Sequence, residues 1–182
     1  SRSIYYRHAR TKIGELINDF KPDLVHLQNI HAHITPSILF EIKKYKLPIV
    51  WTLHDYKLVC PNSHYIIDRT GKICEACKKG SYYQPILKKC KKDDLMASVA
   101  ASLEAYVHKM LGISNLVDVF LTPSEFLRSK LIQNGFNSDK VVHLPLFLGK
   151  NNFDFSADNS GYILYLGRIA YIKGIIPLLA AL

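Results

Sequence analysis

The sequence has no long hydrophobic run and only four cysteines. No apolar stretch approaches the roughly 20 residues that a membrane-spanning helix requires, and the opening residues 1–6 do not resemble a secretory signal. The chain also has no internal repeat. The first absence excludes a membrane-spanning helix from these residues. The absence of a secretory signal makes disulfides a less favoured use of the cysteines than metal binding.

The composition is that of a globular protein. Of the 182 residues, 48% are hydrophobic and 21% are charged, which suffices for one well-cored domain and part of a second. Because the first residue is not Met and residues 175–182 are apolar, we expect both ends to continue in a larger protein.

The charge is strongly positive. The formal net charge is +9, and much of the excess lies in three lysine pairs around the cysteines, at 78–79, 88–89 and 91–92. Such a surface favours the phosphates of nucleotides, nucleic acids or anionic lipid headgroups. A solvated lysine-rich loop is the alternative interpretation.

The hydrophobic pattern alternates between helical spacing and short apolar runs, which is typical of a parallel sheet with crossover helices. Thr35 is expected to cap the second helix, with Pro36 at its first position. Thr122 to Glu125 reads as a capping box, and Asn134-Gly135 as a helix end. The predicted helices are 2–20, 36–45, 95–110 and 123–133, and the predicted strands are 24–27, 48–53, 117–121, 141–144 and 162–166.

The four cysteines follow the strand that ends at His54. Thirteen residues separate Cys60 from Cys74, which forms a CxxC pair with Cys77, and twelve more separate Cys77 from Cys90. Four thiolates at this spacing can hold one zinc ion tetrahedrally, and such a closed site is structural. Reduced or redox-active thiols and disulfides are the alternatives, and His64 is a substitute ligand.

Four segments then carry a resemblance: TLHDYKLVCPN, LTPSEFLRSKLIQNGF, KVVHLPL and ILYLGRIAYIKGIIPLL, in this order. Together they resemble group 1 (family 4) glycosyltransferases, over about residues 21–182. The cysteine-containing segment resembles a bacterial subgroup that makes surface polysaccharides. The resemblance implies the GT-B fold, in which two Rossmann-like domains face a cleft.

The resemblance also implies a domain organisation. Residues 1–148 would form an α/β, Rossmann-like acceptor-side domain whose parallel sheet is flanked by helices, with a cysteine-rich excursion at 60–93. Residues 149–161 would be a linker. Residues 162–182 would be the first β-α unit of a second Rossmann-like domain, which binds the nucleotide sugar.

Residues 167–174 match the family's donor-binding motif. Gly167, Arg168, Lys173 and Gly174 would bind the donor diphosphate, because two cations before a helix N-terminus suit that charge. Neutralising the departing nucleoside diphosphate is the main help that the transfer needs. This sequence departs from the family at Ile172, where an acidic residue is common.

The resemblance places further site residues at strand ends. His54 matches the family's first-domain histidine and is the catalytic candidate, although it could simply cap its strand. Asn29, His31, Asp55 and Ser124 are candidate acceptor-side contacts. Loop ordering by Asp55 and helix capping by Ser124 are alternative roles. His33 lies in the same loop as His31, and metal binding by this pair is a further alternative.

The implied function is sugar transfer from a nucleotide-diphosphate sugar to a carbohydrate or lipid-linked acceptor. The family usually retains configuration and uses no catalytic metal. We expect a cytoplasmic protein, peripheral at the inner face of the plasma membrane, and inactive as these residues alone. The rival is a zinc-stabilised basic nucleic-acid-binding or scaffold module. No nucleic acid is expected, since the tyrosines near the cysteines are not interleaved as a stacking platform.

Overall fold

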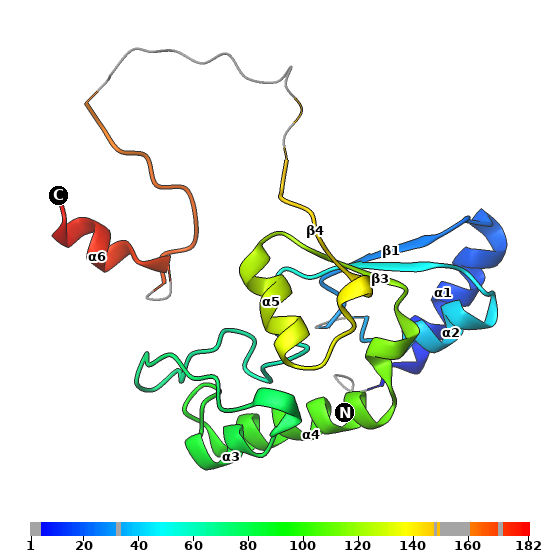
Figure 1. Cartoon of the computed structure of the whole chain (residues 1–182), viewed down its shortest axis with the longest axis horizontal. Helices are drawn as coiled ribbons and strands as arrows, with labels where there is room; N and C mark the ends of the chain where they lie inside the picture. The colour runs from blue at the N-terminus through cyan, green and yellow to red at the C-terminus, as the bar shows by residue number, and fades with distance from the viewer. Residues whose placement is uncertain (1–4, 32–33, 148, 150–160, 171–172) are drawn as a thin grey trace. The chain divides into compact units, whose positions relative to one another are not determined.

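The computed structural model describes residues 5–31, 34–147, 149, 161–170 and 173–182. The chain divides into two compact units, Ser1–Leu146 and Phe147–Leu182, and each is described by itself (Figure 1). Because most of the predicted linker at 149–161 lies outside the described residues, the domain limits drawn from the sequence stay a prediction.

The first unit is built on a parallel four-stranded sheet, as the sequence predicts. The strands pair side by side in chain order, and all three pairings are parallel. Consecutive parallel strands require crossovers of the same hand, which place every crossover helix on the same face of the sheet. The strands are β1 (Val25–Gln28), β2 (Ile49–Thr52), β3 (Val119–Thr122) and β4 (Val141–His143).

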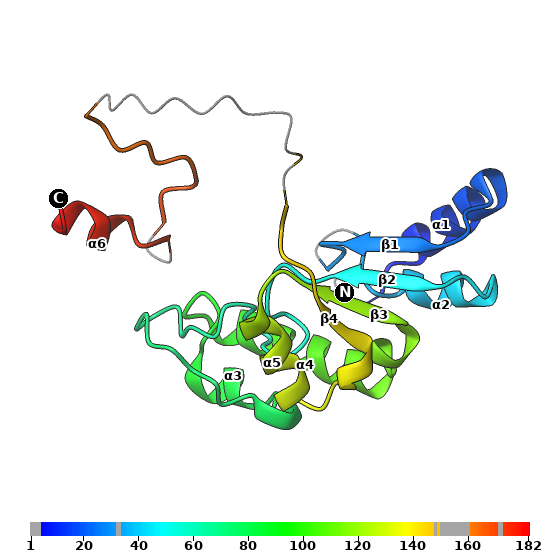
Figure 2. The same ribbon diagram turned by 45° about the horizontal axis from the view of Figure 1, so that its top comes forward.

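The helices cover that one face, and the longest of them, α4 (Leu95–Met110), lies below the strands in the view of Figure 2. Three of them cross between strands: α2 (Ile38–Lys44), α4 and α5 (Glu125–Gln133). α1 (Arg7–Phe20) packs on α2. The shorter elements are η1 (Lys78–Gly80), α3 (Gln84–Lys88), η2 (Ile113–Leu116), η3 (Ser138–Lys140) and, in the second unit, α6 (Ile175–Ala180).

Burial along the strands alternates with the pleat. The side chains that face the helices are buried and form the core with residues of α2 and α5. The side chains of the opposite face are exposed or half-buried, including His26, Gln28 and Val142. The buried strand residues are Leu27, Ile49, Trp51, Phe120, Thr122 and Val141.

Two predicted helix starts need correction. Thr35 does not cap α2: the helix begins at Ile38 with Ser37 at the N-cap position. Thr35 is instead buried with a positive φ of 67°, and its Oγ1 lies 2.8 Å from Ser37 Oγ. The cap of α5 is Ser124, whose Oγ accepts from the Leu127 N–H at 3.2 Å. Thr122 instead belongs to β3, where it pairs with His143 of β4.

α4 is present where the sequence predicts a helix, and Asp94 caps it by accepting from the Ala97 N–H. Its orientation is unusual, because an apolar stripe at helical spacing ordinarily faces the core. Here much of the stripe is exposed, including Met96, Leu103 and Met110, and Val99, Tyr106 and Val107 are half-buried. The buried face is small and polar, consisting of Ser98, Ala101, Ser102, Glu104 and His108.

The predicted strand at 162–166 is wrong, because these residues have no strand hydrogen bonding. A strand needs a neighbour for its backbone groups, and no other strand occurs among the described residues of the second unit. Gly174 precedes α6 with a left-handed φ of 71°. None of the helices in the described part of the chain has both the length and the apolar character needed to span a bilayer.

Candidate functional site

Three predicted site residues lie at the same edge of the sheet. Asn29 follows β1, His54 comes two residues after β2, and Ser124 comes two residues after β3. Because all strands are parallel, their carboxyl ends meet at this edge, which is where open α/β sheets bind ligands. The fold therefore places these candidates at the edge expected for chemistry.

His54 is exposed at this edge. The preceding residue continues the pairing of the strands, since the Leu53 N–H donates to the Leu121 carbonyl at 2.9 Å. The His54 Nε2 lies 3.2 Å from Oε1 of Gln28, at the end of the neighbouring strand. The imidazole is thus accessible to a ligand and is oriented by a side-chain amide.

The other candidates at this edge have visible local roles. Asp55 Oδ1 accepts from the Lys57 N–H at 2.8 Å, which orders the loop after β2. Ser124 is the cap of α5. Asn29 is exposed and has a positive φ of 45°, a conformation that asparagine tolerates better than most residues. These roles account for the three residues without a ligand, and acceptor contact by any of them stays a prediction.

His31 is half-buried and lies against the core. Its ring is tilted over Trp51, with ring centroids 5.1 Å apart, and its Nδ1 is buried without a hydrogen-bond partner among the described residues. Burial, with the charges of Lys57 and His108, lowers the pKa of His31 to about 3. The ring is therefore neutral at physiological pH. His33, the other histidine of this loop, lies outside the described residues.

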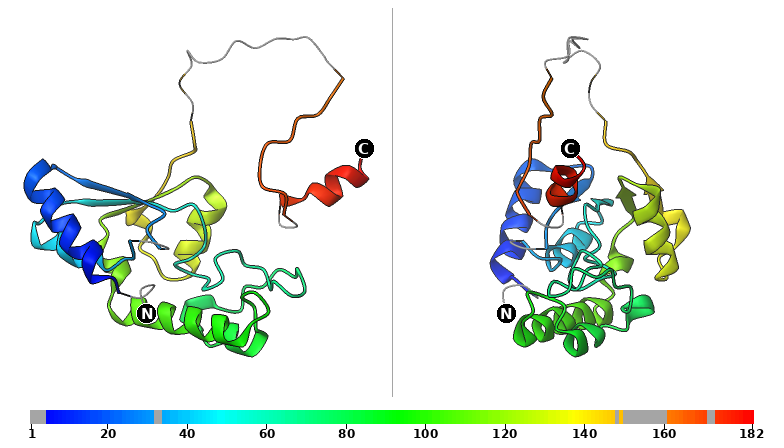
Figure 3. Two further views of the ribbon diagram at one scale, coloured as in Figure 1. Left: turned by 180° about the vertical axis from the view of Figure 1, so that it is seen from behind. Right: turned by 90° about the vertical axis from the view of Figure 1, so that its left-hand side faces the viewer.

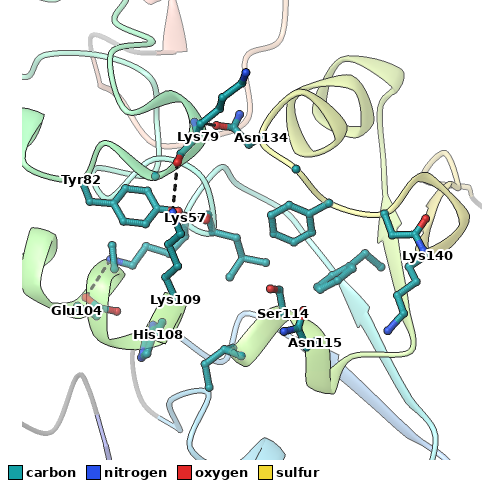
Figure 4. A pocket seen from close by; sticks show the side chains of 18 of the residues that line it. Lys57, Lys79, Tyr82, Glu104, His108, Lys109, Ser114, Asn115, Asn134 and Lys140 are labelled. Carbon is teal, nitrogen blue, oxygen red and sulfur yellow. Dashed lines mark hydrogen bonds and ion pairs between the residues drawn. The ribbon is translucent and has the colours of Figure 1, made fainter. Parts of the chain in front are cut away.

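A cavity of about 430 Å³ opens next to His31, between α4, the segment that follows α5, and the helix-covered face of the sheet (Figure 4). Its lining combines aromatic rings with amides and charged groups. Among the residues that line it are His31, Lys57, Lys79, Tyr82, Glu104, His108, Lys109, Ser114, Asn115, Phe120, Asn134, Phe136 and Lys140.

Four lysines and one glutamate line the cavity, so its lining carries a net positive charge, although the side chain of Lys79 points away from it. Glu104 pairs with Lys57 at 3.0 Å, and both side chains are nearly buried, at 8% and 10% exposure. Lys109 reaches toward the backbone of Lys79, whose carbonyl accepts from its Nζ at 3.2 Å (Figure 4). Lys140 Nζ donates to the Val117 carbonyl. A polar, anionic group suits such a lining.

Sequence reasoning missed Lys57, Glu104, Lys109 and Lys140. One signal was available for Glu104, since it is the only acidic residue within 95–110 and shares a helix face with small residues. Small residues on one face indicate close packing there, and a charge buried at such a face needs a partner. No comparable signal distinguishes these lysines from the many others in the chain.

The four cysteines, which we call the cysteine cluster, lie close enough for their charges to influence one another. Cys60, Cys77 and Cys90 are buried, Cys74 is half-buried, and none forms a disulfide. Two contacts of the loop backbone position them: the Cys74 N–H donates to the Tyr65 carbonyl at 2.7 Å, and Asn62 Nδ2 donates to the Cys90 carbonyl at 2.9 Å.

The thiols influence one another. Burial first, and then the charges of Cys60, Cys90 and Cys74, together raise the pKa of Cys77 to about 12. Burial likewise raises the pKa of Cys90 to about 11, with Cys60 and Cys74 adding to the effect. Within the described ranges, however, no group of three or more His, Cys, Asp or Glu side chains is arranged to hold a metal ion. The zinc site stays a prediction.

The donor-binding candidates all lie in the second unit. Gly167 has a φ of 157°, and the carbonyl of Arg168 accepts from the Tyr165 hydroxyl at 3.0 Å. The Lys173 N–H donates to the Ala170 carbonyl, just before Gly174 and α6. Ile172, which directly precedes Lys173, lies outside the described residues. A diphosphate site at this turn stays a prediction.

Comparison with known proteins identifies the family of this chain. A curated Klebsiella pneumoniae protein described as an "Uncharacterized 42.6 kDa protein in cps region" is 30% identical over 173 residues. The match covers 94% of this chain but 40% of that protein. No solved structure gives a significant match. The sequence model of Glycosyltransferase Family 4 matches residues 1–148, the whole span of the parallel sheet and its helices. By this match and by its fold, the chain belongs to glycosyltransferase family 4.

Proposed function

We propose that the protein transfers a sugar from a nucleotide-diphosphate sugar to a carbohydrate or lipid-linked acceptor. The observation that carries the proposal is the family match over residues 1–148, together with the exposed His54 at the carboxyl edge of the sheet. The similarity to a protein of a cps region supports a role in surface polysaccharide synthesis. We place the reaction at the cytoplasmic face of the membrane, with retention of configuration.

In this proposal His54 faces the reacting sugar and stabilises charge in the transition state. Its exposure leaves the ring free to meet a ligand, and Gln28 fixes its orientation. Arg168 and Lys173 neutralise the departing diphosphate. The acceptor binds on the first unit, where the carboxyl edge and the basic cavity offer polar contacts.

The test is transfer by the complete reading frame that contains these residues. Purified protein is supplied with a panel of nucleotide sugars and lipid-linked acceptors, and nucleoside diphosphate release is measured. We expect release with one donor and a loss of roughly 10²–10³ in kcat for His54→Ala. His64→Ala is the matched control, because His64 is also an exposed loop histidine. Equal activity of the His54 and His64 variants would contradict the assigned role.

We also propose that the cysteine cluster holds a structural zinc ion. The clustering of Cys60, Cys74, Cys77 and Cys90, and their spacing in the chain, support it. Binding requires the thiols to close around the ion from the positions that the structure shows, and to lose their protons. Elemental analysis should find one zinc per chain, reduced in Cys74→Ser. Metal-free parent protein that remains folded would contradict the proposal.

A further inference from the structure

α4 turns an apolar face away from the protein. Met96, Leu103 and Met110 are spaced seven residues apart, which places them on one face of the helix. Their exposed fractions are 73%, 54% and 85%. We call these three residues the outer face of α4. A helix of a globular protein would normally bury such a face, so this one is available to a partner.

The opposite face holds the helix in this orientation. Glu104 is buried and paired with Lys57. Rotation of α4 about its axis would break this buried ion pair. Ser98 Oγ donates to the Asp94 carbonyl and accepts from the Lys91 N–H, at 2.8 Å and 3.2 Å. The outer face is therefore a fixed feature of the fold.

α4 also lies at the margin of the first unit. Figures 1 and 3 show it along the side opposite the sheet, beside α3, with no described element of this unit beyond it. The neighbouring α3 adds a further exposed apolar side chain, Leu87. The apolar surface thus lies on a protruding helix pair, where a broad flat surface can reach it.

Basic residues precede α4 closely in the chain. Lys88 is the last residue of α3, Lys89 and Lys92 lie in the short connection from α3 to α4, and all three are exposed. Two acidic residues follow, but Asp94 caps α4, and Asp93 lies 3.7 Å from Arg69. Exposed apolar side chains beside lysines are the combination by which interfacial helices bind anionic lipids.

We propose that α4 is a membrane-docking helix, whose outer face enters the headgroup region of an anionic bilayer while Lys88, Lys89 and Lys92 contact lipid phosphates. A second copy of the chain is the less favoured occupant. A symmetric dimer through this surface would bring the same lysines of both copies together, whereas an anionic bilayer attracts them. The inference concerns binding alone and stands apart from glycosyl transfer.

The experiment is flotation of the purified chain with vesicles. We expect binding to vesicles of phosphatidylglycerol and phosphatidylethanolamine, and little binding to phosphatidylcholine alone. The triple variant Met96→Ser, Leu103→Ser, Met110→Ser should lose at least roughly tenfold in vesicle affinity. Lys88→Gln, Lys89→Gln, Lys92→Gln should weaken binding and reduce its salt dependence.

The matched control replaces Leu16 and Phe20, which are exposed apolar residues of α1, by serine. This variant should bind vesicles like the parent, and circular dichroism should show that every variant is folded. Absence of parent binding to the anionic vesicles would overturn the proposal, as would an equal loss in the α1 control. A dimer in light scattering that the triple variant dissociates, without vesicle binding, would assign the outer face to a second copy instead.

Discussion

α2 and α4 are both crossover helices with apolar residues at helical spacing. α2 buries its apolar face, whereas α4 buries a face of small and polar residues. α2 buries Ile38, Leu39 and Ile42 against the sheet. α4 buries a face of serine, alanine, glutamate and histidine, and exposes its methionines and Leu103. Apolar periodicity thus predicts that a segment is helical, but it does not determine which side packs. In α4 the buried ion pair and the small side chains decide the orientation.

The largest expected effect concerns the buried charge of α4. Glu104→Ala leaves Lys57 without its carboxylate, which should lower the free energy of unfolding by about 3–5 kcal/mol. Urea unfolding measures the change. The control is Glu15→Ala, which breaks the exposed Lys12–Glu15 pair and should cost about 0–1 kcal/mol. Similar small values for both variants would show that the polar face of α4 does not pack inward.

The same substitution in the two helices compares their apolar faces. Leu39 is fully buried and Leu103 is 54% exposed. Leu39→Ala should therefore cost about 2–5 kcal/mol in the free energy of unfolding, whereas Leu103→Ala should change it by about 0.5 kcal/mol or less. Urea unfolding in the absence of lipid is the measurement. A cost for Leu103→Ala close to that for Leu39→Ala would show that Leu103 is buried, and would contradict the orientation of α4.

A smaller effect should appear as a pH dependence. The pKa of His31, about 3 in the folded protein, lies below the value of about 6.5 expected in the unfolded chain. The unfolded chain therefore takes up the proton more readily, so the contribution of His31 to stability is complete above about pH 6.5 and declines as the pH falls toward 3. Unfolding titrations between pH 7 and 4 should show this slope.

The His31→Asn variant should flatten that slope, because it removes the group that Lys57, His108 and the surrounding core keep neutral. The exposed His64→Asn variant is the control. An unchanged slope in His31→Asn would show that His31 does not lie against Trp51 beside the cavity as the structure describes.

Much of the first unit could be predicted from the sequence, because local patterns determine it. Short apolar runs such as residues 48–53 predict buried parallel strands. Asn134 and Gly135 end α5 as expected, with Gly135 at a φ of 93°. The position of His54 at the carboxyl edge follows from the same strand pattern.

The features that the sequence did not predict depend on contacts between distant segments. The cavity forms where Lys57, Glu104 and Lys140 come together from three parts of the chain. The orientation of α4 depends on one of those contacts. Residues 162–166 have the apolar pattern of a strand, but pattern alone cannot supply the neighbour that a strand requires.

The orientation of α4 can be measured most directly through its methionines, since Met96 and Met110 are the only two in the chain and both belong to its outer face. Dilute hydrogen peroxide converts accessible methionine to the sulfoxide, and mass spectrometry of the intact protein counts the oxygen atoms added. We predict that both methionines of the folded protein are oxidised at nearly the rate of free methionine, and that anionic vesicles slow both reactions. Slow oxidation of the folded protein in the absence of lipid, accelerated by denaturant, would show that the outer face is buried and would contradict the structure described here.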